Sequence, residues 1–221
     1  MNPKTEHTLW EGHSGPIEVS IDRPATENLA GLAVVAHPHP LFGGTKDNKV
    51  AQTLARAFLQ LGYLAVRFNF RGVGKSGGLH DHGNGESHDM LRVIQTAHTS
   101  LLAPSAQKHP IALAGFSFGA FVASHAANLA GQAGLPVGKL ALVGTATSRF
   151  NVARVPADTL VIHGEADDTV PLQTVLDWAR PQSLPVVVMP GVEHFFHGKL
   201  PLLKETLVRY YPALSTDQLH T

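Results

Sequence analysis

Short apolar segments alternate with longer segments of helical periodicity along almost the whole chain, and this alternation restricts the possible folds more than any other feature. The expected strands are residues 16–21, 32–36, 64–70, 111–114, 140–143, 159–162 and 186–189, and the expected helices are residues 47–61, 87–102, 118–130, 172–179 and 199–210. Strands and helices in this order form βαβ units, in which helices cover both faces of a mostly parallel sheet. We therefore predict an α/β fold with a twisted sheet, in a single domain that spans residues 1–221.

The composition supports a packed domain and excludes several kinds of chemistry. Hydrophobic residues make up 43% of the 221 residues and the formal net charge is zero, a balance that sustains a core. The 17 basic and 17 acidic residues provide no excess of positive charge for binding nucleic acid or an anionic membrane. There is no cysteine, which excludes disulfides, thiolate metal ligands and a cysteine nucleophile.

The sequence contains no segment that is typical of secretion or membrane insertion. The start of the chain lacks the apolar stretch of a secretory signal. The most apolar window, residues 112–129, is interrupted by glycine, serine, histidine and asparagine, which are unfavourable in a bilayer. We therefore expect a cytoplasmic protein that acts on a small molecule.

The segment Gly115-Phe-Ser117-Phe-Gly119 lies between an expected strand and an expected helix. In parallel sheets the functional residues follow the carboxyl ends of the strands. A G-x-S-x-G motif at such a place forms a nucleophile elbow, which exposes the serine hydroxyl at the positive end of a helix. We predict Ser117 as a nucleophile; the alternative is a glycine-rich turn with a capping serine.

A serine nucleophile of this kind needs an acid and then a base later in the chain. Asp167 and Asp168 come just after the next-to-last expected strand, and His194 comes just after the last one. Any one of these residues alone would be a common capping or surface residue. Because three suitable residues occur in the required order, each after a strand, we predict a catalytic triad.

The loop after the second expected strand is the candidate for part of an oxyanion hole. Acyl transfer requires two backbone N–H donors for the tetrahedral oxyanion, and Phe118, the residue after the nucleophile, would supply one. Pro38 and Pro40 have no N–H, which leaves His39 and Leu41 for the second donor. We expect Leu41, since the glycine pair that follows permits the sharp turn that would aim its N–H.

Together these motifs resemble the α/β-hydrolase superfamily over about residues 17–210. The segment His37-Pro-His-Pro-Leu-Phe-Gly-Gly-Thr-Lys-Asp-Asn-Lys49 is similar to the small serine hydrolases of that superfamily that have no lid. Further similarity lies in residues 70–77, 163–171 and 193–196. The oxyanion loop departs from the wider superfamily, because a proline stands where a His-Gly-type motif has glycine.

The resemblance implies an α/β-hydrolase fold without a lid or cap domain. It also implies that Ser117, His194 and Asp167 form the triad, with Asp167 rather than Asp168 as the acid. No cofactor and no metal is expected for this chemistry.

The expected substrate follows from the length of one loop. Lids in this superfamily are usually inserted where this chain has only residues 144–158, which are too few for a lid domain. We therefore expect an open cleft and a carboxylesterase-like activity on short or accessible acyl esters, with thioesters and amides as alternatives. The residues expected along the cleft are Leu41, Phe42, Phe118 and Phe195, with His39 as a further contact to substrate.

Other classes of protein fit the sequence less well. A binding protein without catalysis would have no need for all three triad residues. A metal-dependent hydrolase would use His37 and His39, yet the intervening prolines restrict their backbone and no pattern of acidic ligands accompanies them. Residues 72–77 form a G-x-G-x-x-G motif, but neither a helix start nor an acidic residue follows at the spacing that dinucleotide binding requires.

Overall fold

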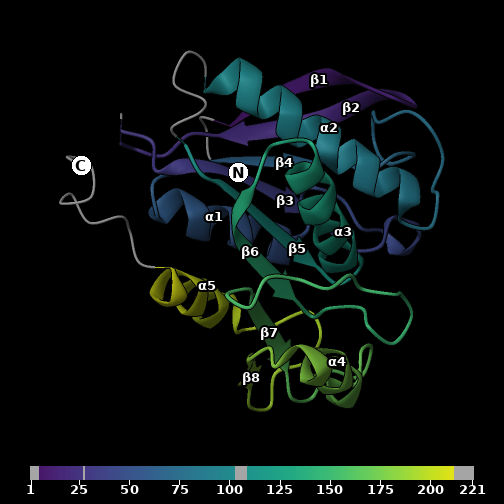
Figure 1. Ribbon diagram of the computed structural model, residues 1–221, viewed down its shortest axis with the longest axis vertical. Helices are drawn as coiled ribbons and strands as arrows, with labels where there is room; N and C mark the ends of the chain where they lie inside the picture. The colour runs from purple at the N-terminus through teal and green to yellow at the C-terminus, as the bar shows by residue number, and fades with distance from the viewer. Residues whose placement is uncertain (1–4, 27, 103–108, 212–221) are drawn as a thin grey trace.

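A sheet with the strand order β1-β2-β4-β3-β5-β6-β7-β8 runs through the molecule (Figure 1). The structure is a computed structural model that describes residues 5–26, 28–102 and 109–211. The strands are β1 (Glu6–Gly12), β2 (Gly15–Asp22), β3 (Gly31–Ala36), β4 (Tyr63–Phe68), β5 (Ile111–Phe116), β6 (Val137–Val143), β7 (Leu160–Gly164) and β8 (Val186–Met189). From β4 to β8 in this order neighbouring strands are parallel, and β1 and β2 are antiparallel to their neighbours. The predicted α/β fold is therefore confirmed.

Helices cover both faces of this sheet (Figure 1). They are α1 (Lys49–Gln60), α2 (Asn84–Leu101), α3 (Phe118–Gln132), α4 (Leu172–Ala179) and α5 (Leu200–Tyr210), with the 3-10 helices η1 (Pro40–Phe42) and η3 (Arg180–Gln182). Phe58 of α1 and Leu203 of α5 are buried in one apolar cluster on one face. Met90 of α2 and Val122 of α3 are buried in the cluster on the other face. α4 lies on this second face, where it packs Val175 against β7.

The strand β1 and the start of α2 differ from the sequence-based expectation. β1 is an exposed edge strand whose side chains are mostly polar, so it lacks the apolar alternation that indicates a strand. α2 begins at Asn84, three residues before the first predicted position, residue 87. The Glu86 carboxylate accepts the N–H groups of Asp81 and Gly83, at 2.9 and 2.8 Å, and this cap starts the helix ahead of its apolar pattern.

The parallel strands direct their carboxyl ends to one edge of the sheet, so the loops after β3, β5, β7 and β8 gather there. These loops, together with the first residue of α3, contain the predicted site residues. Among the described residues, no helix is both long and apolar enough to cross a bilayer.

Candidate active site

Ser117 occupies a sharp turn between β5 and α3. Its backbone has φ 57° and ψ −116°, a conformation that is strained for a residue with a side chain. A Cβ atom at Gly115 would lie 2.1 Å from the carbonyl oxygen of Gly119, so the turn closes only with glycine at that position. The Ser117 N–H donates to Val143 O at 2.8 Å, which ties the turn to β6. The turn thus has the geometry of a nucleophile elbow, with its serine at the positive end of α3.

His194 lies between Ser117 and Asp167. Its Nε2 is 3.1 Å from Ser117 Oγ, and its Nδ1 is 2.6 Å from Asp167 Oδ2. A carboxylate only accepts hydrogen bonds, so Nδ1 carries the proton and Nε2 of the neutral ring is free to accept the serine proton. The three side chains that the sequence predicted as a triad are therefore brought together in a hydrogen-bonded chain.

The loop after β7 fixes the Asp167 carboxylate. Oδ1 accepts the N–H groups of Thr169 and Val170 at 3.0 and 2.7 Å, while Oδ2 faces His194. Burial by itself would raise the pKa of Asp167, but the hydrogen bonds from His194 and the Val170 N–H outweigh it and hold the pKa below its usual range. Asp168 is exposed, and among the described residues its carboxylate accepts only from the Thr169 hydroxyl, at 3.3 Å. The geometry thus brings Asp167, not Asp168, to His194.

A second histidine, His163, lies beside the same carboxylate, and the sequence did not predict a role for it. It is fully buried in β7, with Nε2 2.8 Å from Val170 O and 3.4 Å from Asp167 Oδ2. Burial lowers the pKa of His163, so the neutral ring donates its Nε2 proton to the carbonyl. Its position, one residue before the end of β7, is the signal in the sequence that could have indicated it.

The loop that carries His194 is held by backbone contacts to the end of β7. The N–H of Glu165 donates to Met189 O and that of Ala166 donates to Val192 O, both at 3.0 Å. The Glu193 carboxylate accepts two N–H groups of its own loop, those of Phe195 and His197. The bonds between the loops after β7 and β8 hold the two loops together, and the bonds of Glu193 fix the shape of the second loop. Both keep His194 beside Asp167.

Two backbone N–H groups in the segments around Ser117 have no acceptor among the described residues. One belongs to Phe118, the first residue of α3. The other belongs to His39. The Leu41 N–H, which we expected to be the second oxyanion donor, already has an acceptor. The Leu41 N–H donates to Nδ1 of His39 at 3.2 Å, and the Leu41 side chain is 68% exposed. The cause is η1, in which Pro40 is the first residue and the His39 side chain acts as the cap.

His37 anchors the loop after β3 to the segment that follows β4 and does not offer a metal ligand. Its Nε2 accepts the Phe70 N–H at 3.0 Å and its Nδ1 donates to Pro38 O at 2.7 Å. Burial lowers the pKa of His37 to about 3, so the ring stays neutral. Both nitrogens of His37 and Nδ1 of His39 are therefore engaged in the loop itself. Among the described residues no group of three or more His, Cys, Asp or Glu side chains could hold a metal ion.

A cavity of about 310 Å³, here called the acyl cleft, has Ser117 in its lining. It is lined by Pro38, His39, Phe42, Gly43, Gly44, Asn48, Ser117, Arg149, Thr169, His194 and Phe195. The predicted contacts His39, Phe42 and Phe195 are among these residues. Leu41 lies outside the lining, and the Phe118 ring is fully buried beneath His39, with ring centroids 4.8 Å apart. Arg149 and Thr169 come from irregular loops, where no sequence pattern marks them.

The fold and the serine at its strand–helix turn define the class of α/β serine hydrolases without a lid. The family model described as X-Pro dipeptidyl-peptidase (S15 family) matches residues 16–135, more than half of the 221 residues, and the chain belongs to this α/β-hydrolase family. The expected resemblance is thus confirmed.

Solved structures support the same class. A serine hydrolase without a lid from Xanthomonas campestris is 36% identical, with 95% of this chain and 94% of that chain covered and a TM-score of 0.82. An α/β serine hydrolase homologue from Coxiella burnetii is 39% identical, with 94% and 97% covered and a TM-score of 0.78. An uncharacterized protein of Rickettsia prowazekii is 28% identical over 96% of this chain and 90% of its own length.

Proposed function

We propose that the protein hydrolyses acyl esters through Ser117, His194 and Asp167, with an acyl-enzyme as intermediate. The observation that carries this proposal is the unbroken chain of hydrogen bonds from Ser117 Oγ through His194 to Asp167 Oδ2, at 3.1 and 2.6 Å. Such a chain prepares a serine oxygen to attack an acyl carbon.

In the proposed reaction, Ser117 Oγ attacks the carbonyl carbon while His194 Nε2 takes its proton. Asp167 holds the other ring nitrogen and stabilises the imidazolium that forms. The N–H groups of Phe118 and His39 donate to the oxyanion. His194 then protonates the leaving alcohol, and in the second half of the cycle a water molecule attacks the acyl-enzyme with His194 again as the base.

The cleft supports small acyl groups as substrates. Its volume of about 310 Å³ has room for a short chain, and Phe42 and Phe195 offer apolar surface that is 75% and 46% exposed. The loop between β6 and β7 is short and covers none of this surface with a lid. Short or accessible acyl esters are therefore the proposed class of substrate.

The family description raises peptides as a second class of substrate. A dipeptidyl-peptidase acts on a chain with a free amino terminus, and a protein binds such an ammonium group with carboxylates. Within the described residues, the cleft is lined by neither aspartate nor glutamate. This observation favours esters over peptides with a free amino terminus.

The test is the hydrolysis of p-nitrophenyl esters of increasing acyl length, by the wild type and by Ser117→Ala. We expect activity on the short esters and a loss of about 10⁴–10⁶-fold in kcat for the variant. Ser148→Ala is the control, since Ser148 is an exposed serine that does not line the cleft, and it should keep full activity.

Retention of activity within about tenfold in Ser117→Ala would overturn the proposed mechanism. Activity that survives this change but disappears with a chelator would favour the metal-dependent alternative. A wild type that binds esters without turning them over would favour the binding-protein alternative.

A further inference from the structure

We infer that Arg149 binds an anionic group, a carboxylate or a phosphate, that the substrate carries away from its scissile ester. This inference deepens the proposed ester hydrolysis and rests on it. It assigns part of the substrate to a second, polar groove that lies beside the acyl cleft, and it makes Arg149 a determinant of specificity.

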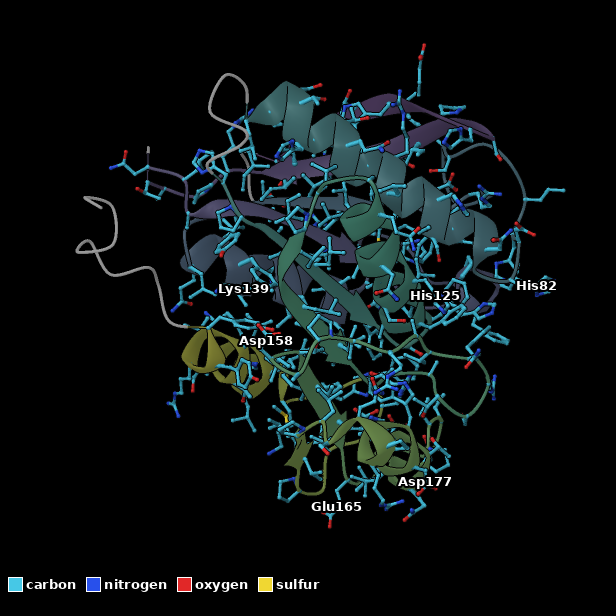
Figure 2. All side chains as sticks on the ribbon, in the orientation of Figure 1. His82, His125, Lys139, Asp158, Glu165 and Asp177 are labelled. Atoms are coloured by element: carbon cyan, nitrogen blue, oxygen red, sulfur yellow. The ribbon has the colours of Figure 1, made fainter. Side chains whose placement is uncertain are left out.

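The second groove has a volume of about 600 Å³, which exceeds the 310 Å³ of the acyl cleft. It lies between the loop before α2, the helix α3 and the loop after β6. Its polar side chains include His82, Asn84, His125, Asn128 and Asn151. Figure 2 labels two of them, His82 from the loop before α2 and His125 from α3. A ligand in this groove would therefore meet imidazole and amide groups.

Arg149 lines both the acyl cleft and the second groove, so the two cavities meet at this residue. Aromatic rings continue from one cavity to the other. The ring centroid of His39 in the cleft lies 5.9 Å from that of Phe150 in the groove, and Phe150 stacks on Phe121 of the groove at 4.8 Å. Because the two cavities share Arg149 and border each other at these rings, we expect a single molecule to place its ester at Ser117 and another part of itself in the groove.

The Arg149 guanidinium has no hydrogen bond or ion pair with any residue that the structure describes. Only its backbone N–H is engaged, to Ala146 O at 3.3 Å. Arg67 and Arg71, by contrast, are held by Asp22 and Asp89 at 3.1 and 2.7 Å. A guanidinium offers five donors in a planar fork that matches a carboxylate or a phosphate. At Arg149 all of these donors remain available to a ligand.

Within the part of the chain that the structure describes, the linings of both cavities contain no aspartate or glutamate. The nearest carboxylates of the loop before α2 are turned to its backbone. Glu86 accepts two N–H groups of this loop, and Asp81 accepts the Gly85 N–H at 3.0 Å. An anion in the groove therefore meets hydrogen-bond donors and the permanent positive charge of Arg149, and no carboxylate in the described lining repels it. A cationic substrate would find no partner there.

The inference is tested with matched pairs of neutral and anionic esters. Mono-p-nitrophenyl adipate is compared with p-nitrophenyl hexanoate to place a carboxylate on the acyl side. 4-Acetoxybenzoate and 4-acetoxyphenyl phosphate are each compared with phenyl acetate, to place a carboxylate or a phosphate on the alcohol side. We expect kcat/KM for at least one anionic ester to exceed that of its neutral partner by about tenfold or more.

Variants connect this preference to Arg149. Arg149→Gln should remove the preference, so that the ratio of kcat/KM for the anionic ester to kcat/KM for its neutral partner falls by about tenfold or more, while Arg149→Lys should retain part of it because the charge remains. The control is Arg154→Gln, since Arg154 is an exposed arginine of the same loop that lines neither cavity. In the wild type, added salt should raise KM for the anionic ester and not for the neutral one.

Two failures are distinguishable. If the wild type hydrolyses the neutral esters but prefers no anionic ester, or if Arg149→Gln keeps the preference, the inference about Arg149 is wrong and the proposed function stands. If the wild type hydrolyses no ester of either kind, the proposed function fails, and the inference fails with it.

Discussion

Gly119, two residues after the serine, fits against the oxyanion loop with no room for a side chain. A Cβ atom there would lie 2.5 Å from the carbonyl oxygens of both Ala36 and His37. We expect Gly119→Ala to displace this loop, and with it the His39 N–H. The loss of one oxyanion donor lowers kcat by about 10²–10³-fold, which steady-state kinetics on a short ester would measure.

Gly131, near the end of the same helix, provides the matched control. A Cβ atom at Gly131 would meet nothing within 4 Å. Gly131→Ala should therefore leave kcat unchanged and raise the free energy of unfolding by about 0.4–1 kcal/mol. Equal kinetic effects of the two substitutions, measured on variants that both unfold cooperatively, would contradict the role given to Gly119.

His37 makes the stability of the fold depend on pH. Its pKa is about 3 in the folded protein because of burial, against about 6.5 in an unfolded chain. Between these values the unfolded chain binds a proton that the folded protein does not. The free energy of unfolding should therefore fall as the pH drops from about 6.5 towards 3, by at most about 1.4 kcal/mol per pH unit for this one proton.

His37→Gln should reduce this dependence, as measured by urea unfolding at pH 7, 6 and 5. His13→Gln is the control, since His13 is an exposed histidine in the turn between β1 and β2. An unchanged slope between pH 7 and 5 in His37→Gln would show that His37 does not remain neutral in the folded protein.

At the scale of elements, α1 begins at a cap that also borders the acyl cleft. Asn48 Oδ1 accepts the N–H groups of Val50 and Ala51 at 2.9 and 3.3 Å, and Asn48 lines the cleft. We expect Asn48→Ala to lower the free energy of unfolding by about 1 kcal/mol, since two N–H groups lose their acceptor. Asn48→Asp should retain most of the stability. Denaturant unfolding of both variants would show whether the cap has this effect.

The elements that the sequence predicted are those in which local pattern and burial agree. β3, β4 and β5 are buried on both faces and are apolar except for Arg67 in β4, and α1 carries apolar residues at helical spacing around Phe58. β1 was missed because pairing with β2, rather than apolar alternation, makes it a strand. η1 was missed because its cap is the His39 side chain, and this same contact removes the Leu41 N–H from the cleft.

At the scale of the whole molecule, some site residues are positioned by the ends of strands and others by the packing of irregular loops. Ser117, Asp167 and His194 follow strands, so the topology of a parallel sheet was enough to predict that they meet. Arg149 could not be found in this way. It lies in a loop without periodicity, and its place between two cavities depends on how that loop packs against α3. His163 directly follows the expected strand 159–162, so the same rule could have indicated it, but only the fold shows that its ring lies beside Asp167.

The position of the proposed base, His194, depends on the edge strand β8. His194 follows β8, a strand of 4 residues at the edge of the sheet, which pairs with β7 and with no other strand that the structure describes. Edge elements open locally at a lower free energy than the core, so fraying of β8 would separate His194 from Ser117 while the other strands stay paired. During synthesis Ser117 is likewise added to the chain before His194. We therefore expect no ester hydrolysis by the proposed mechanism until β8 has paired with β7 and His194 lies beside Ser117.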